Sequence, residues 1–304
     1  MAMNYDHMED CFATLTDKVA YAIENSDLNE LFKKLDAIQG PVLVCGVGGS
    51  SVVASFLAKV LREKRHILAN FIYPRDLNYM DLTPYKSVIA VSYSGRNIGV
   101  DVLSETSLEK YLFTGNAREG FGNILYKMPK EESYVSISAT LVPICLLFLY
   151  YRFDPVLLEK ILSSEINESS SSSAYEVMSG YETSTAAMIL ESSIIEGTLG
   201  TCIIHDKYNF CHGRINLSRI SDSDLIFLKT DSELDEMLLK NLKSHFTNII
   251  CIDTPYQDVV TADLHQTVKA MKLVRNIARS KNIDISDMKE LPDNDLFYRY
   301  AGKM

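Results

Sequence analysis

Two stretches of the chain share one pattern: a short run of β-branched and other apolar residues ends abruptly in glycine and serine. They read PVLVCGVGGSS over 41–51 and SVIAVSYSGRN over 87–97. A continuous apolar run of this length is typical of a buried strand in a parallel sheet, and the change to small polar residues marks the start of a helix. We therefore predict a strand, a loop and a helix in each stretch.

Strands and helices alternate around these two stretches. The hydrophobic pattern predicts strands at 42–45, 67–72, 88–92, 111–114 and 124–127, and helices at 51–61, 98–110 and 138–153. Before them, apolar residues recur at helical spacing from Met8 to Ile38, with Asp27 as the N-cap between two helices. This alternation is typical of an α/β fold with a doubly wound parallel sheet.

The second half of the chain repeats this order in a weaker form. We predict strands at 201–205, 224–229 and 248–253, and helices at 232–242 and 262–280. The last helix carries an apolar stripe that would cover a sheet. The segment LKTDSELDE, which follows the counterpart of the second Gly/Ser strand, has acids where a phosphate needs hydroxyl donors, so we expect no anion site there. The expected fold is two doubly wound parallel-sheet domains of the flavodoxin-like, three-layer αβα type.

The composition changes between the two halves. An unbroken serine run at 169–173 predicts a flexible, exposed serine-rich linker over 163–174. We therefore expect a first domain of residues 1–162, which contains the N-terminal helices and both Gly/Ser loops. A second, degenerate domain would comprise 175–304 with its C-terminal tail.

Charge and composition exclude several classes of protein. A net charge of -10 disfavours a nucleic-acid or anionic-membrane partner, and 47% apolar with 23% charged residues is typical of a globular protein. The most apolar run, 141–151, is much shorter than the roughly 20 residues that cross a membrane.

The six cysteines form no C-x-x-C pair and we expect no signal peptide, so reduced thiols in a cytoplasmic protein are expected. The histidines lack the spacing of metal ligands, so we expect no metal.

The two Gly/Ser loops have the chemistry of an anion site. Glycine allows a tight turn, and the start of a helix presents free N–H groups and the positive end of its dipole. A phosphate suits this site because it accepts several hydrogen bonds at once. The candidate phosphate-binding residues are Gly49, Ser50, Ser51, Ser92, Ser94 and Asn97. The loops match neither G-x-G-x-x-G nor a P-loop, which disfavours a nucleotide; a tight turn without any ligand is the alternative.

At these loops the chain resembles the sugar isomerase (SIS) domain family, whose first strand ends in a Gly/Ser loop and whose third ends in Ser-x-Ser-Gly. It is most similar to the archaeal bifunctional phosphoglucose/phosphomannose isomerases, where GMGGSGVVA and IAVSYSGNT stand in place of GVGGSSVVA and IAVSYSGRN. A more distant likeness is to the isomerase domain of glucosamine-6-phosphate synthase. The resemblance implies a homodimer of double-SIS chains that binds a sugar phosphate between its domains and uses no cofactor. Asn97 stands where the relatives have threonine.

An isomerase of this kind needs a base that moves a proton between C1 and C2 of the sugar. The resemblance implies a catalytic glutamate, a histidine sixteen residues later, and a near-terminal lysine. The segment NFCHGRINL, where we expect the glutamate, has none, so we assign His212 and Arg214 to the sugar. A capping or packing histidine is the alternative for His212. Lys303 matches the lysine, and His265 could enter from the partner subunit, although its polar neighbours favour a solvent-facing side chain.

The sequence therefore predicts a phosphosugar-binding protein, either an aldose–ketose isomerase or a related amino-sugar-phosphate enzyme. The alternative, from a different class, is a non-catalytic phosphosugar sensor. The missing glutamate and the acidic LKTDSELDE segment favour the sensor, whereas the lack of a helix-turn-helix segment or other appended effector disfavours it.

Overall fold

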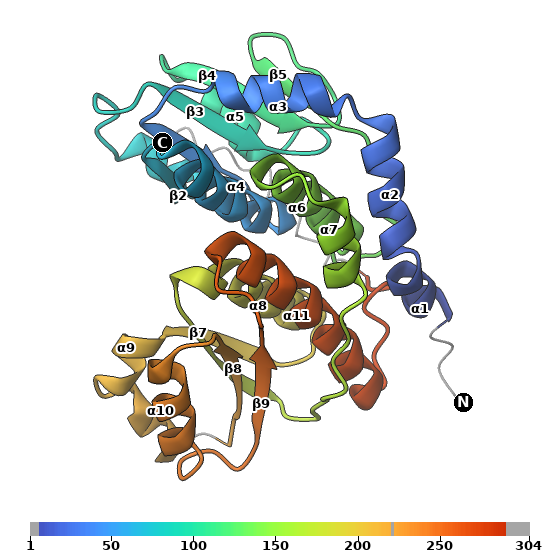
Figure 1. Cartoon of the computed structure of the whole chain (residues 1–304), viewed down its shortest axis with the longest axis vertical. Helices are drawn as coiled ribbons and strands as arrows, with labels where there is room; N and C mark the ends of the chain where they lie inside the picture. The colour runs from blue at the N-terminus through green and yellow to red at the C-terminus, as the bar shows by residue number, and fades with distance from the viewer. Residues whose placement is uncertain (1–5, 220–221, 290–304) are drawn as a thin grey trace. The chain divides into compact units, whose positions relative to one another are not determined.

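The computed structural model describes residues 6–219 and 222–289, which group by contact into two units (Figure 1). Residues 14–131 and 138–153 form the first unit; residues 6–13, 132–137 and 154–287 form the second. Each unit contains one parallel sheet, which confirms the predicted α/β class with two such sheets.

The sheet of the first unit has the strand order β2-β1-β3-β4-β5, and all neighbours are parallel. The strands are β1 (Val42–Cys45), β2 (Ala69–Ile72), β3 (Ser87–Val91), β4 (Glu109–Thr114) and β5 (Gly122–Leu125). In this order the chain leaves β1 and β3 toward opposite sides of the sheet. The carboxyl ends of these two strands are therefore the position at which ligands bind in doubly wound folds, and we call this position the β1/β3 crevice.

Helices cover both faces of the first sheet. They are α2 (Leu15–Asn25), α3 (Leu28–Ala37), α4 (Gly49–Arg65), α5 (Ile98–Ser104) and α6 (Ser138–Tyr151), with the short 3₁₀ helix η1 (Pro74–Asn78). The α6 helix packs on α4 and is buried along almost its whole length, which explains why it is apolar on all sides. Asp27 caps α3 as predicted and accepts the Glu30 N–H. The α5 helix is shorter than predicted because β4 already begins at Glu109.

The sheet of the second unit has the order β7-β6-β8-β9 and is also fully parallel. Its strands are β6 (Ala174–Ser179), β7 (Thr201–Asp206), β8 (Asp224–Lys229) and β9 (Ile249–Asp253). Three of them were predicted, but the central strand β6 was not. By position in the order, β6 is the counterpart of β1 and β8 the counterpart of β3.

Helices also lie on both faces of the second sheet (Figure 1). They are α8 (Ser184–Glu196), α9 (Lys207–Cys211), α10 (Glu233–Leu242) and α11 (Val259–Lys281), with the 3₁₀ helices η2 (Tyr181–Thr183) and η3 (Arg214–Arg219). The helices α1 (Asp6–Ala13) and α7 (Pro155–Leu162) also belong to this unit, and α7 packs on α11. The α8 and α11 helices pack against each other on one face. Residues of α9 and α10 share a buried core with Met178 and Phe227 on the other.

The serine-rich segment 163–174 lies along α11 and is held there by hydrogen bonds. Lys272 Nζ donates to the Ser164 carbonyl at 2.6 Å, and Asn276 Nδ2 donates to the Ile166 carbonyl at 2.8 Å. The Ile166 side chain is buried. These contacts anchor the segment to α11, while seven of its twelve residues are exposed, as expected of a linker. The contact units also differ from the predicted domain bounds, because α1 and α7 group with the second sheet.

Three further observations concern the described residues. None of their helices combines the length and the apolar character needed to cross a bilayer. All six cysteines are free thiols. Within 6–219 and 222–289, no cluster of three or more His, Cys, Asp or Glu side chains has the arrangement of a metal site.

Candidate functional site

The two Gly/Ser loops lie at the same edge of the first sheet. We call residues 46–51 the first loop and residues 92–97 the second loop. Because β1 pairs in parallel with β3, with Cys45 beside Ala90, the loops that follow the two strands begin next to each other. This edge is the β1/β3 crevice, the ligand-binding position of this topology.

Glycine shapes the first loop. Gly48, the N-cap of α4, has φ 57° and ψ -136°, a conformation that strongly favours glycine. A Cβ atom on Gly46 would lie 2.3 Å from the Ser50 carbonyl oxygen, so the strand end approaches the helix too closely for any side chain. Ser51 Oγ donates to the Gly48 carbonyl at 2.7 Å. The start of α4, from Gly49 onward, is half-buried at the crevice.

In the second loop, the side chains of Ser94 and Asn97 have different surroundings. Asn97 is buried; its Oδ1 accepts the Val100 N–H at 3.2 Å and caps α5, and its Nδ2 donates to the last carbonyl of β3 at 3.2 Å. Ser94 is exposed, and its Oγ accepts the Arg96 N–H at 3.3 Å. Ser92 is buried. Asn97 therefore holds the loop on its helix, whereas Ser94 presents a hydroxyl at the surface.

His212 and Arg214 follow β7 at the carboxyl edge of the second sheet. His212 is exposed at the end of α9, and Arg214 begins η3 and lines a cavity of about 420 Å³. The imidazole in this cavity belongs to His205, whose Nε2 is hydrogen-bonded to the Glu176 carboxylate. Both of these side chains are buried. The sequence analysis did not single out His205, and its partner Glu176 lies on β6, the strand that was not predicted.

His265 lies on α11 and is only 7% exposed. Its ring packs against Tyr256 in an edge-on arrangement, with the ring centroids 5.3 Å apart. Burial, and then the charge of Lys269, lower the pKa of His265 to about 4. The expected solvent-facing orientation of His265 is therefore wrong. Lys303 lies outside the described residues.

The SIS resemblance implies a catalytic glutamate sixteen residues before a histidine, and one glutamate that the sequence analysis missed has this spacing. Glu196, the last residue of α8, lies sixteen residues before His212. Its Oε1 accepts a hydrogen bond from Ser192 Oγ at 2.8 Å. Burial, and then the charge of Glu196, raise the pKa of the half-buried Glu191. The signal was present in the sequence, but it lies on the helix before β7 and outside the segment that was searched.

Glu196 and His212 lie at opposite edges of the second sheet. The α8 helix ends at Glu196 before β7 begins at Thr201, whereas His212 follows the end of β7. A strand of this length spans about 20 Å. One chain therefore does not bring these two side chains together.

A cavity of about 720 Å³ lies at the carboxyl edge of the second sheet. Its lining comes from the segments that follow all four strands, beginning with Gly180 after β6, Asp206 at the end of β7, Thr230 after β8 and Tyr256 after β9. The cavity therefore occupies the β6/β8 crevice, the counterpart of the β1/β3 crevice.

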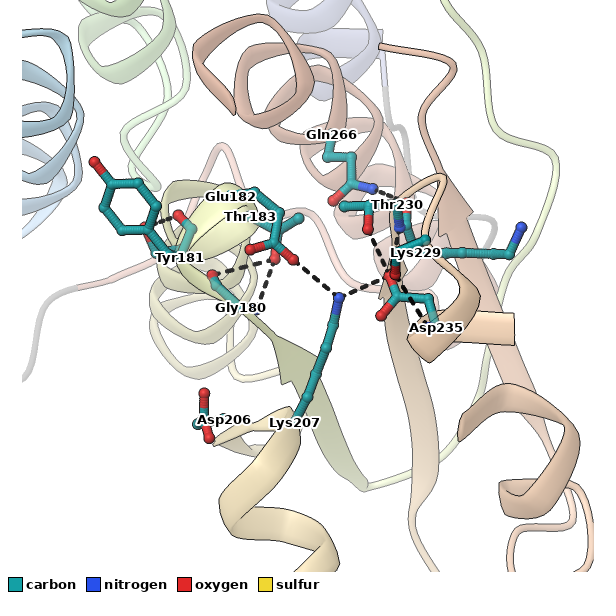
Figure 2. Close-up of polar contacts among 12 residues, drawn as sticks. Gly180, Tyr181, Glu182, Thr183, Asp206, Lys207, Lys229, Thr230, Asp235 and Gln266 are labelled. Carbon is teal, nitrogen blue, oxygen red and sulfur yellow. Dashed lines mark hydrogen bonds and ion pairs between the residues drawn. The ribbon is translucent and has the colours of Figure 1, made fainter. Parts of the chain in front are cut away.

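Lys207 is at the centre of the polar network in this cavity (Figure 2). Its side chain is 4% exposed, and its Nζ lies 3.1 Å from Glu182 Oε1 and 2.8 Å from Asp235 Oδ2. Asp235 also accepts hydrogen bonds from the backbone N–H and the hydroxyl of Thr230, at 2.6 and 2.8 Å. The ammonium lies 5.6 Å from the centroid of the Phe227 ring. The buried charges compensate one another, as buried charges must.

A carboxylate of the protein occupies the N-terminus of α8. Asp263, fully buried on α11, accepts the backbone N–H groups of Thr185 at 3.2 Å and Ala186 at 3.1 Å. These N–H groups are the ones that bind an external anion at a free helix start. The counterpart in the first unit is the start of α4, where Gly49 and Ser50 are half-buried. The two crevices thus differ in their capacity for an anion.

Comparison with known proteins gives a structural likeness. No family model matches the chain, and no curated protein sequence matches it. A Clostridium difficile protein described as a phosphosugar isomerase has a TM-score of 0.71 at 13% identity, over 95% of this chain and 97% of its own. Glucosamine-6-phosphate deaminase of Thermotoga maritima has a TM-score of 0.69 at 17% identity, over 92% and 98%. The C-terminal domain of glucosamine-fructose-6-phosphate aminotransferase from Francisella tularensis has a TM-score of 0.67 at 11% identity, over 92% and 98%. At these identities the likeness establishes the fold.

Proposed function

We propose that this protein binds a phosphorylated sugar at its two Gly/Ser loops. It would catalyse an aldose–ketose isomerisation, or a related amino-sugar-phosphate reaction, as a cytoplasmic homodimer without a cofactor. The observation that carries the proposal is the position of the two loops, next to each other at the β1/β3 crevice. The names of the three similar structures support it, because each name mentions a phosphorylated sugar. The motif likeness to the archaeal phosphoglucose/phosphomannose isomerases supports it as well.

The loops would hold the phosphate by hydrogen bonds. The hydroxyls of Ser50 and Ser94, together with the N–H group of Gly49 at the start of α4, are the proposed donors. Ser51 would join them by turning its hydroxyl from the Gly48 carbonyl to the phosphate. Ser92, which is buried, would support the second loop from below. Asn97 would act as a positioning residue, since both polar ends of its side chain bind the loop and its helix. Anchoring the phosphate would supply binding energy that orients the distant reacting carbons.

The proton transfer would use Glu196 and His212. In the open-chain aldose phosphate, the Glu196 carboxylate would remove the proton from C2. The C–H electrons would form the C1–C2 double bond as the C1=O electrons move onto O1, which takes a proton to give the enediol. The proton held by Glu196 would then go to C1 as O2 loses its proton and C2=O forms, so that in sum one proton moves from C2 to C1 and one from O2 to O1. His212 would protonate the ring oxygen on ring opening, and Arg214 and Lys303 stay candidates for contacts with the sugar. His265 receives no role, because a buried imidazole with a pKa of about 4 is a weak base.

The positions of Glu196 and His212 within the second unit support the proposed homodimer. Because they lie at opposite edges of one sheet, a site that contains both needs Glu196 from one copy and His212 from the other.

The experiment is a thermal-shift screen against hexose, pentose and amino-sugar phosphates, with the matching unphosphorylated sugars as controls, followed by NMR turnover assays. We expect stabilisation by one sugar phosphate and turnover that is lost in Glu196→Gln while binding remains. Binding without turnover in the wild type would favour the phosphosugar sensor. The absence of stabilisation by any sugar phosphate would contradict the proposal.

A further inference from the structure

We infer that the cavity at the carboxyl edge of the second sheet is a second ligand site, and that it takes a small, hydroxylated organic amine in its protonated form. An unphosphorylated amino sugar has this chemistry. The site belongs to the second unit and does not depend on the Gly/Ser loops, so the inference goes beyond the proposed function.

The charge of the cavity favours a cation. Four carboxylates and one ammonium line it, those of Glu182, Asp206, Asp231, Asp235 and Lys207, which gives a formal net charge of -3 at pH 7. Lys207 already binds Glu182 and Asp235, and Asp206 caps α9 by accepting two backbone N–H groups. Asp231 is exposed after β8. This excess of negative charge attracts a cationic ligand and repels an anionic one.

The aromatic lining favours an organic cation over an inorganic one. Tyr181, Tyr208 and Tyr256 reach the cavity from the segments after three different strands. Tyr208 is 71% exposed, so its ring is available to a ligand. Ring faces attract organic ammonium groups and cover the C–H surface of a small molecule. A metal ion would make no use of these rings.

A buried acceptor without a donor lies beside Thr230, which lines the cavity. Gln266, on α11, is fully buried, and its Nε2 donates to the carbonyls of Lys229 at 2.5 Å and Ile252 at 2.9 Å. Its Oε1 has no hydrogen-bond partner in the part of the chain that the structure describes. Figure 2 shows this oxygen on the side of the amide that faces Glu182. Gln266 is not among the residues that line the cavity, so the acceptors that a ligand's N–H groups can reach there are the carboxylates of the lining.

The same cavity is unsuited to a phosphate. Asp263 already accepts the N–H groups of Thr185 and Ala186 at the start of α8, where a phosphate would bind. A phosphorylated ligand would also meet the net negative charge of the lining. An anionic ligand would therefore bind in the β1/β3 crevice, and a cationic ligand in the β6/β8 crevice.

The test is an NMR titration of the full-length Ser94→Ala variant, in which the proposed phosphate site is weakened. The ligands are glucosamine, glucose and glucose 6-phosphate, and the readout is the backbone amide shifts of Tyr208 and Asp231. We expect glucosamine to shift these amides and to bind about tenfold more tightly than glucose, which corresponds to one favourable charge interaction. Glucose 6-phosphate should leave them unchanged.

Variants of two exposed residues test the lining without disturbing the buried network. Asp231→Asn and Tyr208→Ala should each weaken glucosamine binding by about threefold to tenfold. Asp222→Asn, which removes an exposed carboxylate just before β8 at the opposite edge of the sheet, is the matched control and should leave the affinity unchanged.

Three results would overturn the inference. If no ligand moves the Tyr208 and Asp231 amides, the cavity is not a site. Equal affinity for glucose and glucosamine would contradict selection for an amine, and displacement of glucosamine by millimolar Mg²⁺ would indicate an inorganic cation instead. None of these results concerns the Gly/Ser loops, whose own test is the binding of a sugar phosphate to the wild type.

Discussion

Asp263 Oδ1 lies 3.1 Å from the backbone nitrogen of Ala186. This contact distinguishes the two crevices of the chain, because the same topology places a helix start at the edge of each sheet. In the second unit the helix start binds a carboxylate of the protein itself, whereas α4 in the first unit begins with small residues at the crevice. At the start of α4 the Ser50 and Ser51 N–H groups donate to the backbone carbonyls of Val47 and Gly48, at 3.2 and 2.8 Å, and not to a carboxylate. Of the two helix starts, the one in the β1/β3 crevice is therefore the one that an external phosphate can approach.

Replacing Asp263 should destabilise the second unit. Asp263→Ala removes the acceptor of two buried backbone N–H groups, and hydrogen bonds to a charged group contribute about 1.5 to 3 kcal/mol each. We expect the free energy of unfolding, measured by urea denaturation, to fall by about 3 kcal/mol, and by less in Asp263→Asn, whose amide oxygen still accepts. Equal stability of the wild type and Asp263→Ala would show that the N–H groups are satisfied in another way.

The Lys207 network should respond strongly to the loss of its cation. Lys207→Met leaves Asp235, which is 1% exposed, without its opposite charge, and breaking a buried pair in this way costs about 3 to 5 kcal/mol. Lys269→Met is the control: its partner Asp253 is 69% exposed, so the loss should be below about 1 kcal/mol. Urea denaturation of both variants measures the difference. Similar losses in the two variants would contradict the buried role of Lys207.

His265 should make the stability of the protein depend on pH in the mildly acidic range. Its pKa is about 4 in the folded protein and about 6.5 in an unfolded chain. Between these values the unfolded state binds the proton, so the contribution of His265 is fully present above pH 6.5 and is lost as the pH falls toward 4. The loss is about 3 kcal/mol at most. We expect His265→Gln to unfold with a shallower pH dependence in this window; an unchanged dependence would mean that the imidazole is accessible to protons.

Subunit complementation tests the assignment of Glu196 and His212. Glu196→Gln and His212→Asn should each be inactive as homodimers and still bind the sugar phosphate. Co-expression of the two variants should restore about a quarter of the wild-type activity, because half of the dimers are mixed and each mixed dimer has one intact site. A mixture as inactive as the single variants would contradict a site that two copies share.

The first unit could be predicted from the sequence because its strands are continuous apolar runs with clear Gly/Ser ends. The strand β6 could not, since Glu176 interrupts its apolar pattern. The compensating residue, His205, lies 29 positions later on the neighbouring strand, and only the strand register brings the two together. Without β6, the segment up to residue 174 was interpreted as a linker, and the helix that carries Glu196 was not predicted.

The candidate sites were predictable to different degrees, depending on whether their residues are close together in the sequence. The Gly/Ser loops are local, so their sequence alone places them after neighbouring strands. The Lys207 network joins Glu182 and Asp235, which are 25 and 28 positions away, and no local motif signals it. The phosphate-binding residues and the proton-transfer residues remain predictions from motif and position.

The most direct measurement is a calorimetric titration of the sugar phosphate found in the screen into wild type and Ser94→Ala. Ser94 is exposed, and its removal should leave the fold intact. We expect the wild type to bind, the unphosphorylated sugar not to compete, and Ser94→Ala to bind about 10- to 100-fold more weakly, the loss of one hydrogen bond to a charged group. The same affinity in the variant, or binding that does not require the phosphate, would contradict the central claim that the Gly/Ser loops bind a phosphorylated sugar.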